Sequence, residues 1–268
     1  MSRILLKLFQ LIFCRRFFYP LNRFLYLLSL HGLGYLNSQD FKISGELWLL
    51  NIFFRDTSNK TVFDVGANTG AYSALVKKLN PNVSLYAFEP HPISYQALKD
   101  CSAAHNFQAY HLGFSDQLGQ AQLHDLKDGV NSELASLHAQ VFSKIHQQES
   151  VAYTVDLDTI DNFCANQNIH NIDLLKIDTE GHEYAVLRGA TQLLQNGRVK
   201  VIQFEFNEMN VASKVFLKDF IDLLVGYRFF MLLSDGLEPI KYSPVKSEIF
   251  AFCNIVAVRE DYLHKLNS

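Results

Sequence analysis

From residue 60 onward, short apolar runs alternate with segments whose apolar residues recur three to four positions apart. The first pattern is typical of buried strands and the second of helices. The predicted strands cover residues 62–65, 83–88, 107–112, 172–177, 199–206, 228–233 and 249–258. The helices predicted between them cover residues 72–79, 93–104, 157–165, 183–194 and 216–224. The alternation predicts an α/β fold, with a mostly parallel seven-stranded sheet covered by helices on both faces.

Two regions depart from this alternation. The last two predicted strands have only a loop between them, so one of them is expected to run antiparallel. Residues 113–156 carry turn signals, two short β-like pieces and a helix that contains His138 and His146. An insertion over the ligand face, at about residues 117–150, is the simplest account, and the two histidines are expected to face solvent.

The first 43 residues form a separate unit, an apolar helical arm that carries cations and precedes one domain over residues 44–268. Arg3, Lys7, Gln10 and Cys14 recur at helical spacing and leave the other face apolar; Pro20 is expected to end this helix, and a second follows over 21–30. Residues 1–39 contain no acidic residue. Residues 1–36 could therefore lie on an anionic membrane, or the same apolar face could be buried on the protein's own domain or on a second subunit.

Composition narrows the class of protein. The chain has 268 residues, of which 49% are hydrophobic and 19% charged, enough to bury a substantial core. A net charge of -3 gives no sign of a nucleic-acid partner. The four cysteines are scattered without a CxxC pair, which argues against a zinc site or a disulfide framework. Because this usage fits a reducing compartment, and no apolar run suits a signal peptide or a membrane span, a cytoplasmic protein is expected.

The candidate chemistry begins in the stretch "TVFDVGANTG", where a strand runs into Asp64, Gly66, Asn68 and Gly70. This stretch could be an ordinary strand-to-helix turn, or a loop whose amides face a ligand. Glu89 ends the next strand, where a carboxylate can accept the hydroxyl hydrogens of a ribose. The G-x-G-x-x-G fingerprint of NAD sites is absent, and an acidic residue before the glycines suits a cationic ligand. These features favour S-adenosylmethionine.

Four segments then resemble the FkbM family of methyltransferases: "VFDVGANTG", "YAFEPHP", "LLKIDTEGHEYAVLRGA" and "IQFEFNE", within a likeness that runs from about residue 44 to 258. The resemblance implies the class I methyltransferase (Rossmann-like) fold and an S-adenosylmethionine-dependent enzyme. It also implies methylation of a hydroxyl on a sugar, glycan or other bacterial metabolite.

Carried onto this chain, the resemblance assigns the methionine end of the cofactor to four residues and the ribose to Glu89. The four are Asp64, Gly66, Asn68 and Gly70. Asp116, in "GFSD", either reaches the adenine amino group or is a turn residue.

The reaction itself needs positioning and a group that takes the hydroxyl proton. Asp178 and Glu205 end the next two strands and, with Asn207, could bind the acceptor, act as a base or hold magnesium. Only three ligands are evident, so no metal site is assigned. His182 either acts as the base or opens the following helix. The polar cluster at 131–136, in "NSELASL", either lines the acceptor pocket or caps a helix.

Two other classes of protein remain open from the sequence. One is a Rossmann oxidoreductase linked to NAD or to a nucleotide sugar, against which the missing fingerprint counts. The other is a non-catalytic cofactor-binding module, against which the intact Asp64, Gly66, Gly70 and Glu89 count.

Overall fold

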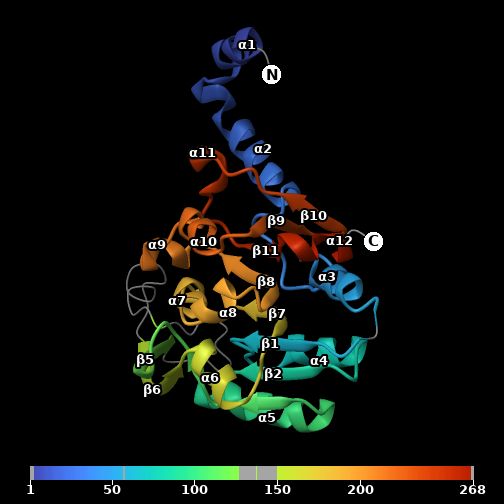
Figure 1. Cartoon of the computed structure of the whole chain (residues 1–268). Coiled ribbons are helices and arrows are strands. Elements are labelled where there is room, and N and C mark those ends of the chain that lie inside the picture. The colour runs from blue at the N-terminus through green and yellow to red at the C-terminus, as the bar shows by residue number, and fades with distance from the viewer. Residues whose placement is uncertain (1–2, 57, 127–136, 138–149, 267–268) are drawn as a thin grey trace.

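A computed structural model describes residues 3–56, 58–126, 137 and 150–266 of the chain. Its core is an eight-stranded sheet in the order β10-β9-β11-β8-β7-β1-β2-β3 (Figure 1). The strands are β1 (Thr61–Val65), β2 (Ser84–Phe88), β3 (Gln108–Tyr110), β7 (Ile172–Ile177), β8 (Val199–Phe206), β9 (Tyr227–Leu233), β10 (Gly236–Pro239) and β11 (Cys253–Arg259). β3, β2, β1, β7 and β8 run parallel, and β11 lies antiparallel between β8 and β9. This strand order is that of the class I methyltransferase fold, so the predicted fold class is confirmed.

The eighth strand was not predicted. β10 pairs antiparallel with β9 at the edge of the sheet, where Gly236 lies opposite Leu233. A short helix, α11 (Pro244–Ser247), follows it. Both elements lie in the segment predicted to be only a loop, because four-residue elements carry too little periodicity to be recognised.

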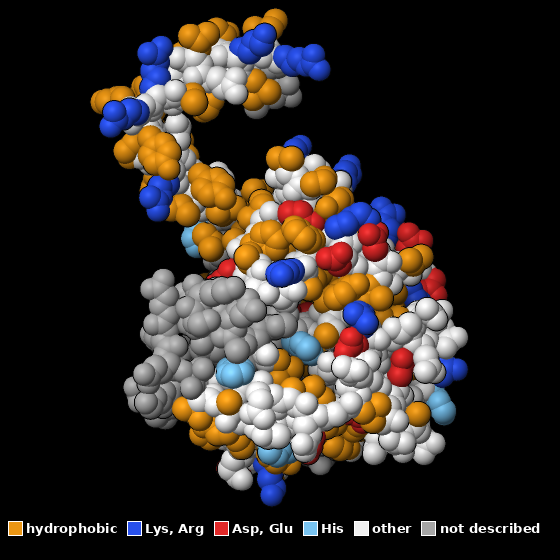
Figure 2. All heavy atoms as spheres, turned by 90° about the vertical axis from the view of Figure 1, so that its left-hand side faces the viewer, with side chains coloured by type: hydrophobic (Ala, Val, Ile, Leu, Met, Phe, Trp, Pro, Cys, Tyr) orange, Lys and Arg blue, Asp and Glu red, His pale blue; other side chains and the backbone are white. Residues whose placement is uncertain are grey.

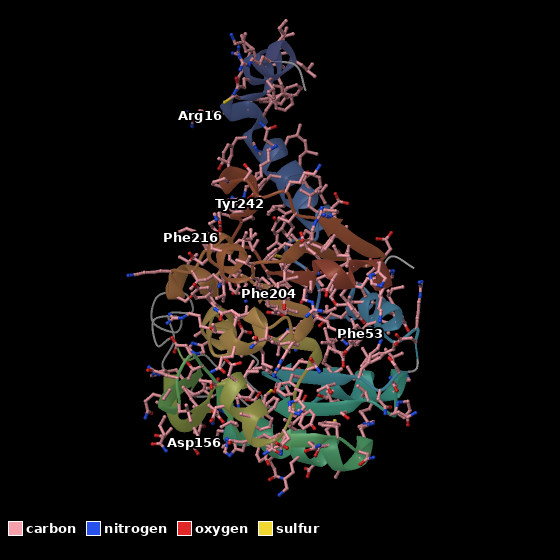
Figure 3. The ribbon with its side chains drawn as sticks, viewed as in Figure 1. Arg16, Phe53, Asp156, Phe204, Phe216 and Tyr242 are labelled. Carbon is pink, nitrogen blue, oxygen red and sulfur yellow. The ribbon has the colours of Figure 1, made fainter. Side chains whose placement is uncertain are left out.

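Helices cover both faces of the sheet. They are α3 (Glu46–Phe53), α4 (Ala71–Leu79), α5 (Pro92–His105), α6 (Ile160–Asn166), α7 (Glu183–Arg188), α8 (Thr191–Gln195), α9 (Met209–Ser213), α10 (Leu217–Leu223) and α12 (Leu263–Leu266), with the 3-10 turn η3 (Glu260–Tyr262). Successive strand residues enter different hydrophobic clusters: Phe63 belongs to one and Val62 to the other. Figure 3 marks Phe204 in the first cluster and Phe53 in the second. The sheet is therefore buried on both sides, as its long apolar strands predict.

Two helix predictions need correction. The helix predicted over 183–194 is two helices, α7 and α8, which meet at Gly189. A Cβ on Gly189 would lie 2.0 Å from the backbone oxygen of Ser115. Only glycine, which has no side chain, allows the segment around Ser115 to pack this closely against the helix end. The helix predicted over 157–165 begins at Ile160, because the preceding strand extends to Asp158.

A second, three-stranded sheet occupies the predicted insertion. β5 (Gly119–Leu126) and β6 (Ser150–Asp158) form an antiparallel pair, and β4 (Gly113–Phe114) joins β6 in parallel. The residues between β5 and β6, apart from Leu137, lie outside the described part of the chain. His138, His146 and the polar cluster at 131–136 are among them.

The N-terminal arm consists of α1 (Arg3–Phe13), the 3-10 turn η1 (Arg16–Phe18) and α2 (Tyr19–Gly32). Pro20 lies in the first turn of α2, where its missing N–H costs nothing, and the first helix ends earlier, at Phe13. The arm projects away from the sheet (Figure 1). None of the described helices has the length and apolar character needed to cross a membrane.

Candidate active site

The carboxyl ends of the parallel strands open onto a cavity of about 730 Å³, called here the central cavity. Its lining includes residues at the ends of four parallel strands and at the start of the antiparallel β11. Those residues are Val65, Glu89, Asp178, Glu205 and Asn254. Because parallel strands present their carboxyl ends at one edge, this is where an open α/β sheet binds its ligand.

The loop after β1 is shaped by close approach of its neighbours. Gly66 has a φ of 78°, and a Cβ there would lie 1.7 Å from the backbone oxygen of Asp178. Gly70 has a φ of 89°, and its Cβ would lie 2.9 Å from Leu98. Both glycines are thus required by packing and backbone conformation. Gly66 and Asn68 line the central cavity, whereas Gly70 opens α4 behind it.

Glu89 joins this loop to the end of β2. One of its carboxylate oxygens accepts the backbone N–H of Asn68 and the other that of His91, each at 2.8 Å. The side chain is buried, and burial raises the pKa of Glu89 to about 7. A carboxylate has about four acceptor positions, so two remain for ligand hydroxyls. Asn68 also contributes a buried side-chain oxygen that has no hydrogen-bond partner.

Two predicted cofactor carboxylates, like Gly70, lie outside the described lining of the cavity. Asp64 is fully buried, accepts a hydrogen bond from the Ser73 hydroxyl at 2.6 Å and is absent from the described lining of the central cavity. Asp116 is also absent from that lining and lies 3.1 Å from the guanidinium of Arg188. Asp116 as an adenine contact or as a turn residue stays a prediction.

A buried lysine lies among the carboxylates of the cavity. The ammonium of Lys176, on β7, is 3.0 Å from Asp178 and 3.6 Å from Asp64. Burial alone would lower the pKa of Lys176, but the carboxylates of Asp178, Asp64, Glu46 and Glu205 raise it well above its usual range. Lys176 is hence a permanent cation at this edge of the sheet.

Three carboxylates gather beside this lysine. Asp178, Glu180 and Glu205 each bring one oxygen within 4.8 Å of the others. Burial, together with the negative charges of Asp178 and Glu180, raises the pKa of Glu205 well above its usual range. Three carboxylates this close cannot all be ionised without cost, so the site favours a proton on Glu205 more than ordinary glutamate does.

The turn that carries Glu180 is held by Glu183. One oxygen of Glu183 accepts hydrogen bonds from the backbone N–H groups of Thr179 and Gly181, at 2.9 and 3.0 Å. Glu180 adopts a φ of 51°, in the left-handed region that few residues visit. Burial raises the pKa of Glu183 to about 7. Glu183 thus positions Glu180, and neither residue was predicted to act in this way.

His182 and Asn207 complete this side of the cavity. His182 precedes α7, as one of its two predicted alternatives requires, and its Nε2 lies 3.0 Å from the Ser115 hydroxyl. It lines the central cavity, so its role as a base stays a prediction. The side-chain oxygen of Asn207 accepts the N–H of Met209 at 2.9 Å. That oxygen therefore stabilises the turn after β8. The third side chain that groups with Asp178 and Glu205 is Glu180, not the predicted Asn207.

The chain before α3 supplies a further wall that the sequence did not reveal. Asn37, Ser38, Gln39 and Phe41 line the cavity, so the predicted boundary at residue 43 falls within the lining segment. Glu46 lines it too, and is held at 2.9 Å by the side-chain amide of Gln203, which also donates to Asn254.

The comparison with known families decides the identity. The model of the "Methyltransferase FkbM domain" matches residues 64–229, more than half of the chain. The chain belongs to the FkbM methyltransferase family. The family and the strand order together are those of an S-adenosylmethionine-dependent methyltransferase, which sets aside the oxidoreductase alternative.

Several relatives of this FkbM protein are similar over part of their length. The 2-O-methyltransferase NoeI of Sinorhizobium fredii is 21% identical over 66% of this chain and 76% of its own. The hexuronic acid methyltransferase AglP of Haloferax volcanii is 23% identical over 60% of this chain and 63% of its own. The 31-O-demethyl-FK506 methyltransferase FkbM of Streptomyces tacrolimicus is 26% identical over 63% of this chain and 72% of its own.

Among solved structures, a TehB-like SAM-dependent methyltransferase from Corynebacterium glutamicum matches at 13% identity with a TM-score of 0.43. The match covers 89% of this chain and 96% of that one.

Proposed function

We propose that this protein transfers a methyl group from S-adenosylmethionine to a hydroxyl of a sugar, a glycan or a similar polyhydroxyl metabolite. The observation that carries the proposal is the meeting of two sets of groups in one cavity. Glu89 and Asn68 lie on one wall, and the Asp178–Glu180–Glu205 carboxylates lie on another. The first set suits an adenosine-bearing cation, and the second suits a hydroxyl that must lose a proton.

Residues on the β1 and β2 side fit the cofactor. Glu89 keeps two acceptor positions for ribose hydroxyls, and Asn68 offers a buried oxygen without a partner. Leu112, Phe114 and Leu157 supply an apolar wall for a base. S-adenosylmethionine, when bound, supplies an electrophilic methyl group carried on a sulfonium.

On the other side, Asp178 is proposed to accept the hydroxyl proton. The neighbouring Lys176 holds one of its oxygens at 3.0 Å, which fixes the carboxylate in place. The raised pKa of Glu205 favours its protonated form, which can donate a hydrogen bond to an oxygen of the acceptor. His182 is the competing proton acceptor, since it lines the same cavity.

The charge of the cavity bears on the acceptor. Within its described lining, six residues carry carboxylates and Lys176 is the sole lysine or arginine. The six are Glu46, Glu89, Asp178, Glu180, Glu205 and Glu208. Burial raises the pKa of Glu46, Glu89 and Glu205 and so reduces their negative charge. Asp178, Glu180 and Glu208 still outnumber Lys176, so an anionic acceptor would meet repulsion. A neutral or cationic polyhydroxyl compound is therefore favoured over a uronic acid or a phosphate.

The test is methyl transfer from isotope-labelled S-adenosylmethionine to a panel of neutral, amino and uronic sugars. Mass spectrometry of the products locates the new methyl. We expect transfer to oxygen on neutral or amino sugars. Transfer only to uronic acids would contradict the charge argument, and cofactor binding without transfer to any compound would favour the non-catalytic module.

A further inference from the structure

The arm at residues 3–33 carries most of the exposed apolar surface of the described structure. Of 24 large hydrophobic side chains that are exposed, 16 lie between Ile4 and Leu33. α1 buries none of its residues, and α2 buries only Leu30. Figure 2 shows the arm standing clear of the body, with apolar and basic side chains over its surface. Apolar surface of this extent marks a place of interaction.

Within α1, polar and apolar positions are separated. Arg3, Lys7 and Gln10 recur at helical spacing and share one face. The remaining faces carry exposed leucine, isoleucine and phenylalanine, among them Leu8 at 53% and Leu11 at 65% exposure. This is a helix with a wide apolar face and a narrow cationic stripe.

The bend between the two helices is held by contacts within the arm. The rings of Phe9 and Phe13 stack with centroids 4.7 Å apart, and Phe13 meets Phe18 edge to face at 5.0 Å. The side-chain amide of Asn22 donates to the backbone oxygen of Phe13 at 2.9 Å. α1 is therefore held by ring contacts and a hydrogen bond within the arm and buries none of its residues, whereas α2 reaches the core of the domain through Leu30.

We propose that the arm is an anchor that lies on the surface of an anionic lipid bilayer. Its apolar face would enter the boundary between headgroups and acyl chains, while its cations meet lipid phosphates. The cations are Arg3, Lys7, Arg15, Arg16 and Arg23, and residues 1–39 contain no carboxylate to oppose them.

Other occupants fit less well. The 11 residues of α1 span roughly 16 Å and the 14 of α2 roughly 21 Å, short of the ~30 Å hydrocarbon core, so the helices lie on the bilayer and do not cross it. A second copy that met this surface arm to arm would place cations against cations without a carboxylate between them.

The base of the arm ties this anchor to the central cavity. A Cβ on Gly34 would lie 2.7 Å from the Leu233 side chain of β9, so the chain is held closely there. From Leu33 to Asn37, the first lining residue, four residues can extend no more than about 14 Å. The C-terminal end of α2 is therefore close to one wall of the cavity, so an anchor at the arm would hold the cavity at a limited distance from the bilayer. If the proposed methylation holds, on which this step alone depends, an acceptor attached to a lipid would be concentrated near the enzyme.

The test is co-sedimentation of the full chain with vesicles of pure phosphatidylcholine and with vesicles that also contain phosphatidylglycerol. We expect binding to the anionic vesicles at low salt, at least tenfold weaker binding to the neutral ones, and weakening by salt. Leu8→Asp places a charge on the apolar face, and Gln10→Asp places the same charge on the polar face. We expect Leu8→Asp to weaken binding at least tenfold more than Gln10→Asp does.

Both variants change exposed positions of a helix without buried residues, so S-adenosylmethionine binding by calorimetry should be the same in each. That measurement separates failure of the anchor from failure of the proposed function. Absence of binding to anionic vesicles at low salt would overturn the proposal. So would a dimer, seen by light scattering, that Leu8→Asp dissociates while vesicle binding is unchanged.

Discussion

The ammonium of Lys176 lies 3.0 Å from the carboxylate of Asp178, in a cavity whose described lining carries six acidic side chains. An isolated buried charge is costly, whereas a charge surrounded by opposite charges is stabilised. The buried charge of Lys176 is therefore stabilised by the carboxylates around it, and their charges are stabilised by Lys176. Because the ammonium of Lys176 already supplies positive charge beside Asp178, the site has less need of a metal ion.

Treatment with a chelator is expected to leave turnover within about twofold of the untreated enzyme. Lys176 already neutralises Asp178, and the amide oxygen of Asn207, predicted as a third ligand, is occupied by the N–H of Met209. Methyl transfer should be assayed after dialysis against EDTA, with and without added magnesium. Loss of turnover that magnesium restores would instead assign Asp178, Glu180 and Glu205 to a metal.

Asp178→Asn and Glu205→Gln are expected to differ in their effect on turnover. Asp178→Asn removes the proposed proton acceptor, so turnover should fall by about a hundredfold or more. Burial and the neighbouring carboxylates raise the pKa of Glu205 well above its usual range, and glutamine resembles the protonated form of glutamate. Glu205→Gln should therefore lower turnover by less than about tenfold.

The single-turnover rate of each variant measures the effect on turnover, and its thermal unfolding temperature shows whether the fold is retained. The exposed Glu238→Gln is the matched control. Full activity in Asp178→Asn, with loss in a His182→Gln variant, would transfer the role of base to His182.

Glu89→Ala is expected to weaken S-adenosylmethionine binding by about 1.5–3 kcal/mol, the contribution of hydrogen bonds to a charged group. Asp116→Asn should change binding by less than about twofold, since Asp116 contacts Arg188 outside the cavity lining. Calorimetry with S-adenosylmethionine and with NAD tests both statements. An equal loss of S-adenosylmethionine affinity in the two variants would show that Asp116 contacts the cofactor.

Stability should fall as the pH rises from about 4.5 to 7. Burial raises the pKa of Glu89 and of Glu183 to about 7, so in this window the folded protein keeps protons that the unfolded chain releases. Glu183→Gln removes one such group. The difference in unfolding free energy between wild type and variant should fall by about 2 kcal/mol between pH 5 and 7.5. Urea unfolding at several pH values measures it, and parallel curves for the two proteins would refute the assignment.

Gly66→Ala is expected to destabilise the fold by at least about 2 kcal/mol, because it combines strain at positive φ with steric overlap. Its Cβ would meet the backbone oxygen of Asp178 at 1.7 Å, so neither strand end could stay in place. Gly236→Ala, with open space around its Cβ, should change stability by less than about 1 kcal/mol. Chemical unfolding of the two variants gives the comparison, and equal stabilities would mean that the strand ends are not in close contact.

Alternation of apolar runs and helical spacing was enough to predict the fold class, since a sheet buried on both faces leaves long apolar strands in the sequence. The break at Gly189 was not predicted in this way, because the close approach of the Ser115 backbone oxygen comes from a segment distant in the sequence.

Predicted strand ends located the edge of the sheet where the central cavity opens, but not which of the side chains line it. Asp64 lies inside β1 and is fully buried, whereas Glu89 follows the last residue of β2 and lines the cavity. Lys176 was missed because it lies within a strand, and Glu46 because it precedes the first predicted strand.

The position of β11 between β8 and β9 has a consequence for folding during synthesis. Until residues 253–259 have left the ribosome, β8 and β9 each expose an unpaired edge where β11 will later pair. Asn254, which accepts a hydrogen bond from the Gln203 amide that also holds Glu46, arrives with the same strand. The nascent chain therefore passes through a stage in which two strands have unpaired backbone groups and the cavity is incomplete. At this stage binding by a chaperone would protect the chain most from aggregation.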